Sequence, residues 1–405
     1  MNANKPRLIL HIGTMKTGTT SIQQVFDVRR ADMLAQGAYY PQSPGTRAHE
    51  LLTYAATNGE RGPRPDDPFW RGIDRTERLA RFREEFAAEM AAIPPHVNRV
   101  VISDERFSFY LRTPAHLAAL HAMLRPHFDN IEVVAYLRRQ DSFLASRYAE
   151  QLRVGAVGEP DHKRDNAERM QDYDYRRLLE DWAAVFGAAA IKPRIYERGA
   201  HKTFDSVSDF MASCGIDLVV NPGDTGARSN PSMNLAGQQV LREVGSMLQK
   251  KTGARSVVGP LWRRISDAVT EALPGKGWMP TRAEAAEFMA RFEDGNEAVR
   301  HRYFPDRATL FADDSANFPV DAAEIGPEAK FVAACAALLE VAERSQKREA
   351  TLERAAAKAV QDAKARQDAK LGQNARLGQN AKRGQDAKAG QNARLGQNAK
   401  ASADA

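Results

Sequence analysis

A short apolar segment that runs directly into a loop of glycine and threonine is the feature that most restricts the possible folds of this chain. Residues 8–12 read LILHI, residues 13–21 read GTMKTGTTS, and Ile22, Val25 and Phe26 then recur at the spacing of one helix face. The glycines allow a ligand to approach the backbone closely, and N–H groups at the start of a helix attract an anion. This segment therefore predicts a phosphate-binding loop between a strand and a helix.

The position of the lysine separates this loop from that of the nucleotide triphosphatases, which reads G-x-x-x-x-G-K-[ST]. Gly13 and Gly18 keep the glycine spacing, but Thr19 stands where the lysine is required, and Lys16 lies inside the loop. Lys16 adds a positive charge to the phosphate site, while Thr19 and Thr20 add hydroxyl donors. A P-loop kinase or nucleotide hydrolase is disfavoured but stays an alternative.

Apolar segments alternate with helical patterns over the first half of the chain. The predicted strands are Leu8–Ile12, Val100–Ser103, Ile131–Tyr136 and Ile191–Tyr196. Helices are predicted over roughly residues 19–35, 75–92, 114–125, 141–153 and 173–187. This alternation predicts an α/β fold of the P-loop type, with a central parallel sheet flanked by helices. Ligands of such sheets bind at the carboxyl ends of the strands, where the motifs at residues 13–20, 104–106 and 138–146 are expected.

The positive charge of the chain is concentrated near its C-terminal end. The formal net charge of the 405 residues is +6, but residues 361–405 hold nine Lys and Arg against four Asp, which leaves the rest close to neutral. A nucleic-acid partner is therefore not expected. Cys214 and Cys335 show no metal spacing and predict free thiols in a reducing compartment. Without a signal peptide or an apolar run of membrane length, we expect a cytoplasmic protein.

The remainder of the chain is irregular, helical or repetitive. Residues 40–72 are rich in Pro, Gly, Arg and Asp, and we expect either a functional lid or disorder there. Residues 233–345 predict a mainly helical extension of the first domain, and residues 346–360 a helical linker. Glutamine then recurs every six residues over 361–405, a spacing that lines no single helix face. We expect this low-complexity tail to be disordered. It is either a passive repeat expansion or a segment that contacts an anionic surface.

A second motif follows the third predicted strand. Arg138 is succeeded by Ser146 eight residues later and by Tyr148 two residues after that. An arginine at a strand end offers a fork of N–H donors to a phosphate, and Ser146 adds a hydroxyl from the next helix. This motif by itself is also compatible with an ordinary charged helix start.

Together the two motifs resemble those of bacterial sulfotransferases of the P-loop fold that use 3′-phosphoadenosine 5′-phosphosulfate (PAPS). The sequence K-[ST]-G-T-T resembles their 5′-phosphosulfate loop, and R-x-P-x-x-x-x-x-S-x-Y their 3′-phosphate site, with Gln140 in place of the proline. Residues 100–107, 195–198, 230–233 and 296–311 resemble further family segments, so that the resemblance covers about residues 6–320.

The resemblance implies a sulfotransferase domain over residues 1–345 that moves a sulfuryl group from PAPS to a hydroxyl or amine of an acceptor. A carbohydrate or glycolipid is the expected acceptor. The resemblance assigns Arg138 and Ser146 to the 3′-phosphate, and it assigns to the 5′-phosphosulfate Lys16, Thr17, Gly18, Thr19, Thr20 and Ser21. With a lysine beside the bridging oxygen, no metal is required. A non-catalytic scaffold that acts through the repeat tail is a further alternative.

The general base is expected at a neighbouring strand end. Glu105 is the first candidate, because the family uses a Glu or a His in this role and a carboxylate in a closed cleft can become more basic. The alternative is that Glu105 pairs with Arg106 or caps the next helix. His11 is the second candidate, although its position favours a hydrogen-bonded core histidine. Arg106 stands where relatives often have His.

Overall fold

The computed structural model describes residues 5–60, 74–163, 167–197, 205–221, 223–225, 232–253 and 259–349, together with residues 351, 352, 355, 358 and 361. Two compact units are present, Met1–Ala337 and Leu338–Ala405. The first unit contains the sheet and the candidate site, and in the second, residues 338–349 are helical. The expectations for residues 61–72, for Asn230 and Pro231, and for the tail beyond Gln361 lie outside the described residues.

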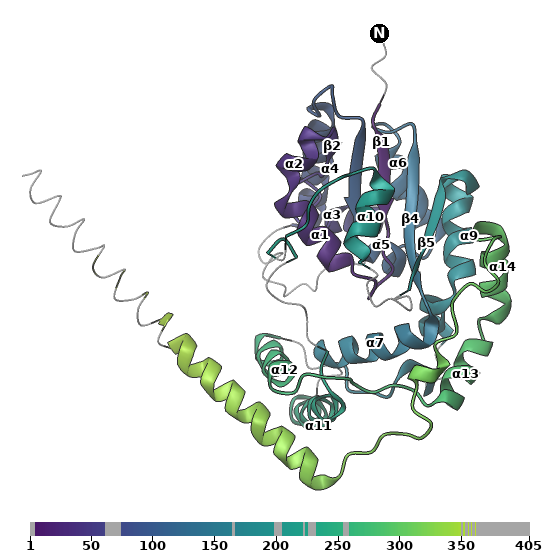
Figure 1. Ribbon diagram of the computed structural model, residues 1–405. Helices are drawn as coiled ribbons and strands as arrows, with labels where there is room; N and C mark the ends of the chain where they lie inside the picture. The colour runs from purple at the N-terminus through teal and green to yellow at the C-terminus, as the bar shows by residue number, and fades with distance from the viewer. Residues whose placement is uncertain are drawn as a thin grey trace, which may run out of the picture. The chain divides into compact units, whose positions relative to one another are not determined.

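A sheet of five parallel strands forms the centre of the first unit (Figure 1). The strands are β1 (Arg7–His11), β2 (Ala38–Tyr39), β3 (Arg99–Ser103), β4 (Ile131–Arg138) and β5 (Ile191–Tyr196), in the order β2-β3-β1-β4-β5. The central strand β1 lies between β3 and β4, and its Leu10 is opposite both Ile102 and Val133. The α/β class and four of these strands are confirmed. The edge strand β2 has two residues, too few to form a recognisable apolar run.

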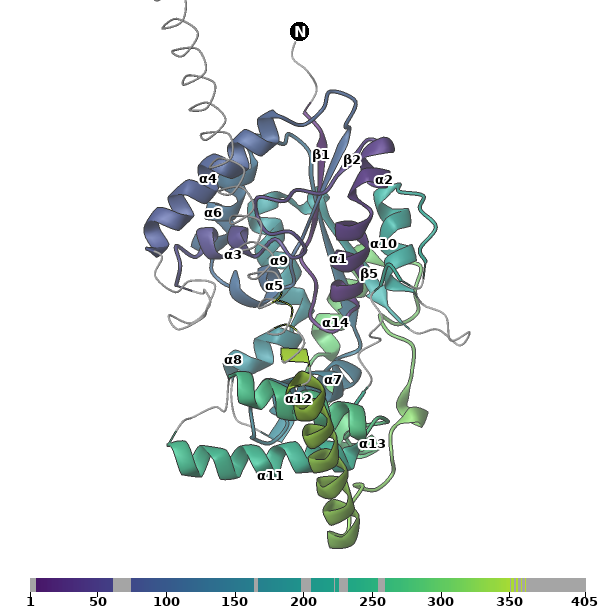
Figure 2. The same cartoon turned by 90° about the vertical axis from the view of Figure 1, so that its left-hand side faces the viewer.

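Helices cover both faces of the sheet (Figure 2). One face carries α1 (Thr19–Val28), α2 (Arg30–Ala35) and α10 (Ser206–Cys214). The other carries α3 (Glu50–Ala56), α4 (Arg75–Ala91), α6 (Pro114–Leu124) and α9 (Tyr175–Phe186). Leu8 and Leu10 belong to the core on this second face, whereas Ile9 packs with Phe26 and Phe210 on the first. Because β1, β3 and β4 are buried on both faces, they read as nearly continuous apolar runs, whereas the edge strand β5 is only partly buried.

Helix α3 corrects the expectation for residues 40–72. That segment was expected to be a lid or disordered, but residues 51–56 are all buried in a helix. Leu51 and Leu52 join the core on the second face of the sheet, and the Thr53 hydroxyl donates to Asp104 Oδ2 at 3.0 Å. The apolar residues between the proline-rich ends of this segment therefore determine its structure by burial. Residues 41–45 have no regular structure, as predicted.

The helical extension is confirmed and lies largely beyond the carboxyl ends of the strands, next to α7 (Gln140–Arg153) (Figure 1). Its helices are α11 (Leu235–Thr252), α12 (Pro260–Ala272), α13 (Arg282–Ala290) and α14 (Glu293–Tyr303). Pro260 occupies the first turn of α12, where its missing N–H costs no hydrogen bond. No helix within the described part of the chain is long and apolar enough to cross a membrane.

His11 at the end of β1 has no exposed surface, and this burial lowers its pKa to about 3. Because this pKa lies below the ordinary value of 6.5, the contribution of a neutral His11 to stability is complete above pH 6.5 and is lost as the pH falls towards 3. We expect the slope of the unfolding free energy between pH 6 and 4.5 to be smaller in His11→Gln than in the wild type, by about 1.4 kcal/mol per pH unit. Urea unfolding at several pH values measures both slopes, and equal slopes would contradict a neutral, buried His11.

Candidate functional site

The loop between β1 and α1 is held in a fixed conformation by β4. Gly13, Lys16 and Gly18 all have positive φ angles, of 95°, 64° and 86°. The backbone N–H and the hydroxyl of Thr14 both donate to the carbonyl of Tyr136, at 3.3 and 2.9 Å. In return, the N–H of Tyr136 donates to the carbonyl of Gly13 at 2.6 Å. The loop is therefore attached to the neighbouring strand instead of projecting freely.

Six consecutive backbone N–H groups of this loop are available for an anion. Among the described residues, the N–H groups of residues 15–20 donate to no protein acceptor, and the first bond of α1 is from Ser21 to the carbonyl of Gly18 at 3.0 Å. Thr17 and Thr19 are buried, and buried backbone donors are normally paired, so these N–H groups together suit a ligand with several acceptor oxygens. The positive end of the α1 dipole adds to the attraction.

The threonine hydroxyls of the loop act mainly within it. Thr17 and Thr19 are buried, and their hydroxyls donate to the carbonyl of Thr14 at 2.6 and 3.3 Å. Thr20 is exposed and Ser21 is half-buried. The structure thus gives Thr17 and Thr19 a role in shaping the loop, and it leaves the backbone N–H groups as the donors for an anion.

Gly18 has no room for a side chain. A Cβ atom at this position would lie 2.0 Å from the Oγ of Ser206 at the start of α10, in a backbone conformation that other residues rarely adopt. We expect Gly18→Ala to lower the free energy of unfolding by about 1–3 kcal/mol, the usual cost of overpacking. Adding Ser206→Gly should recover part of this loss by removing the clashing atoms. Urea unfolding of both variants tests this, and wild-type stability of Gly18→Ala would contradict the close contact.

The second motif meets the first at the end of β4. Arg138 donates from Nη1 to the carbonyl of Lys16 at 2.9 Å, and its guanidinium lies 5.5 Å from the ring centre of Tyr196 on β5. The Tyr175 hydroxyl donates to the Arg138 carbonyl at 2.5 Å. Two segments that are far apart in the sequence thus place a lysine and an arginine in one region.

Two further residues of the second motif, Gln140 and Ser146, lie on α7. Gln140, which replaces the family's proline, is fully buried and exchanges amide hydrogen bonds of 2.6 and 3.2 Å with Asn296 of α14. It therefore joins α7 to the helical extension, a contact that a proline cannot make. Ser146 is half-buried, one turn before Glu150 on the same face of α7, and Glu150 Oε2 lies 3.3 Å from Lys16 Nζ.

Glu105 lies against the start of the loop. A Cβ atom added to Gly13 would be 3.1 Å from both Cα and Cβ of Glu105, and the Gln23 side chain donates to Glu105 Oε2 at 3.1 Å. Arg106 pairs instead with Asp104 and Glu50, each at 3.0 Å. Glu105 precedes α5 (Arg106–Tyr110) without a side-chain capping bond. Neither of the ordinary structural roles considered for Glu105 is therefore seen.

Asp104 contacts α3, whereas Glu105 contacts Gln23 of α1. Asp104 has no exposed surface and accepts hydrogen bonds from Thr53, from the backbone N–H of Arg106 and from the guanidinium of Arg106. Burial raises the pKa of the Asp104 carboxyl, and the adjacent guanidinium of Arg106 opposes this shift. Asp104 therefore anchors the strand end to α3.

His11 occupies a core position. Its Nδ1 lies 2.8 Å from Ser103 Oγ, and its ring lies 4.7 Å from that of Phe210, centre to centre. Its Nε2 has no hydrogen-bond partner among the described residues. With no exposed surface, His11 has the environment of a packed core side chain instead of a group that faces solvent.

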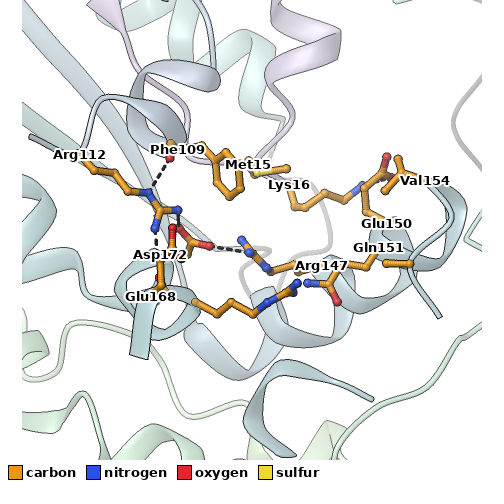
Figure 3. Close-up of a pocket in the computed structure, with 12 residues that line it drawn as sticks. Met15, Lys16, Phe109, Arg112, Arg147, Glu150, Gln151, Val154, Glu168 and Asp172 are labelled. Atoms are coloured by element: carbon orange, nitrogen blue, oxygen red, sulfur yellow. Dashed lines mark hydrogen bonds and ion pairs between the residues drawn. The ribbon is translucent and has the colours of Figure 1, made fainter. Parts of the chain in front are cut away.

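A cavity of about 530 Å³ opens beside Lys16 (Figure 3). The loop, α5, α7, α8 (Ala167–Met170) and the adjoining residues contribute to its lining. Its apolar wall consists of Met15, Phe109, Val154 and Ala156, and its charged residues are Lys16, Arg112, Arg147, Glu150, Glu168, Arg169 and Asp172.

The charged groups of this cavity form a paired network. Arg147 is almost fully buried and pairs with Asp161 and Asp172. Arg112 also reaches Asp172, so that Asp172 lies between the two arginines (Figure 3). Such pairing compensates for removing the charges from water. Sequence reasoning missed this network, because Asp161 and Asp172 come from a segment without a recognisable motif. No group of three or more His, Cys, Asp or Glu suited to a metal ion occurs within the described residues.

Comparisons with known proteins leave the family of the chain open. No family model matches it. An uncharacterized protein of Archaeoglobus fulgidus is 27% identical over 177 residues, which are 43% of this chain and 46% of that relative. The match thus spans less than half of the relative's length.

Two solved structures resemble this chain weakly, each with a low TM-score. A sulfotransferase from Alicyclobacillus acidocaldarius is 16% identical with a TM-score of 0.34, over 64% of this chain and 99% of that one. A sulfotransferase domain from the curacin biosynthetic pathway is 11% identical with a TM-score of 0.34, over 82% and 97% of the two chains. Likenesses at this level carry no weight for function, so the function must follow from the site itself.

Proposed function

We propose that this protein is a sulfotransferase that moves a sulfuryl group from PAPS to a hydroxyl or an amine of an acceptor. The observation that carries the proposal is the meeting of the two motifs. The N–H groups of residues 15–20 form an anion site, and Arg138, bonded to the Lys16 carbonyl, adds a guanidinium beside it. A donor with phosphate groups on both the 3′ and the 5′ oxygen of its ribose needs two such positive regions.

Each residue of the site has a separate task in this proposal. The N–H groups of residues 15–20 hold the 5′-phosphosulfate, with Thr20 and Ser21 at the helix start, and Arg138 and Ser146 hold the 3′-phosphate. The acceptor oxygen or nitrogen attacks sulfur while the bond between sulfur and the bridging oxygen breaks. The Lys16 ammonium stabilises the negative charge that develops on the leaving phosphate, and Glu105 accepts the acceptor's proton. No step in this scheme requires a metal ion.

The cavity beside Lys16 is the proposed site for the body of the acceptor, and because Glu105 is not among its lining residues, the reacting group extends from the cavity towards Glu105. Its volume of about 530 Å³ suits one small organic molecule or the end unit of a longer chain. We propose a carbohydrate or a glycolipid as the acceptor, with Phe109 and Met15 available to contact the face of a sugar ring. The cytoplasmic location expected from the sequence stays a prediction.

Binding of labelled nucleotides tests the proposed function. We expect the wild-type chain to bind PAPS, to bind its 3′-dephosphorylated analogue more weakly, and to leave ATP unchanged. Cleavage of ATP would instead indicate a kinase or hydrolase, and binding of none of the three would favour a scaffold. Equal affinity for PAPS and the dephosphorylated analogue would contradict the assignment of Arg138.

A further inference from the structure

The Lys16 ammonium has a partner that its sequence motif does not include. Lys16 Nζ lies 3.3 Å from Glu150 Oε2, and the two side chains are 30% and 28% exposed. Glu150 is on α7, whereas Lys16 is in the loop after β1, so the pair joins two separate elements of the site (Figure 3). Arg153 Nη1 also lies 3.4 Å from Glu150 Oε2, so that the carboxylate has a second cation at hand.

The backbone of Lys16 is fixed while its side chain can change partner. The carbonyl of Lys16 accepts the hydrogen bond from Arg138, and the residue has a φ angle of 64°. The half-exposed side chain is held at its tip by Glu150. An anion bound at the N–H groups of residues 15–20 would be a second negative group, besides Glu150, that the Lys16 ammonium can reach.

We propose that Glu150 is a positioning residue that directs Lys16 towards α7 in the donor-free protein and competes with the donor for its ammonium. This inference rests on the proposed function, since it needs an anionic donor in the loop. Glu150 acts by attracting the same ammonium that would otherwise pair with the donor. When the donor binds, the Lys16 ammonium leaves Glu150 and pairs with the donor. Arg153 then remains as the counter-ion of Glu150.

Calorimetric binding of adenosine 3′,5′-bisphosphate, the spent donor, to the full chain tests this exchange. We expect Glu150→Gln to bind the bisphosphate more tightly than the wild type, by about two- to fivefold, which is the range for a half-exposed ion pair. Lys16→Ala should bind it more weakly, and Glu150→Gln should have no further effect in the Lys16→Ala chain. A gain in affinity is informative because damage to the fold does not produce one.

Glu168→Gln is the matched control. Glu168 is exposed, lines the same cavity, and forms no ion pair with Lys16 among the described residues. The control removes the same charge from the same cavity, and we expect it to bind the bisphosphate with wild-type affinity.

The outcomes separate this inference from the proposed function. If the wild type does not bind the bisphosphate, the proposed function fails and this inference fails with it. If the wild type binds and Lys16→Ala weakens binding, the inference alone is overturned by any of three results. These are an unchanged or weaker affinity of Glu150→Gln, an equal gain in Glu168→Gln, and a gain from Glu150→Gln that persists without Lys16.

Discussion

Lys16→Ala is expected to reduce the turnover of PAPS with any accepted acceptor by about 100- to 1,000-fold, the usual cost of removing one group that stabilises developing charge. The reason is the position of Lys16 in a loop whose N–H groups at residues 15–20 bind no other part of the described protein. The ammonium is the charged donor that this loop itself contributes. Steady-state turnover with labelled PAPS measures the loss.

Met15→Ala is the control for this change. Met15 precedes Lys16 in the loop and lines the same cavity, but it carries no charge. We expect Met15→Ala to alter acceptor affinity more than turnover at saturation. Wild-type turnover in Lys16→Ala, with urea unfolding showing an intact fold, would remove Lys16 from the mechanism.

Arg138→Ala is expected to abolish the preference for a 3′-phosphate. A hydrogen bond to a charged group is worth about 1.5–3 kcal/mol, so the affinity for adenosine 3′,5′-bisphosphate should fall by about 10- to 100-fold. The affinity for adenosine 5′-monophosphate should change much less. Because Arg138 also bonds the Lys16 carbonyl, the ratio of the two affinities is the informative quantity. A distorted loop would weaken both nucleotides alike.

The neighbouring arginine provides a matched control. Arg139 binds Asp141 at 2.9 Å and the carbonyl of Ala312 at 2.8 Å, and so it supports the wall of the site instead of the loop. We expect Arg139→Ala to keep the preference for the 3′-phosphate. If Arg139→Ala loses that preference and Arg138→Ala retains it, the assignment of the 3′-phosphate to Arg138 is wrong.

The centre of the sheet was predictable because β1, β3 and β4 are buried on both faces. Leu8, Leu10 and Ile9 supply apolar side chains to two different cores, so β1 appears in the sequence as an uninterrupted apolar run. The edge strand β2 and the buried helix α3 were missed for the opposite reason. Each is short and lies among prolines and glycines. Tertiary contacts stabilise them, as the hydrogen bond of Thr53 to Asp104 does for α3.

The loop of the site was predictable, but its partners were not. Glycine spacing and the following helix were enough to indicate an anion site at residues 13–20. Glu150 and Gln23 carry no motif, and they matter only because folding brings them to Lys16 and Glu105. Pairings of this kind depend on how helices pack against the loop, which a single sequence does not encode in any local pattern.

A crystal structure with adenosine 3′,5′-bisphosphate is the most direct test of the central claim, that the loop holds the 5′-phosphate and Arg138 the 3′-phosphate of one nucleotide. We expect the 5′-phosphate to accept hydrogen bonds from the backbone N–H groups of residues 15–20, and the 3′-phosphate to lie against the Arg138 guanidinium. A nucleotide bound elsewhere, or bound with its 3′-phosphate in solvent, would contradict the account.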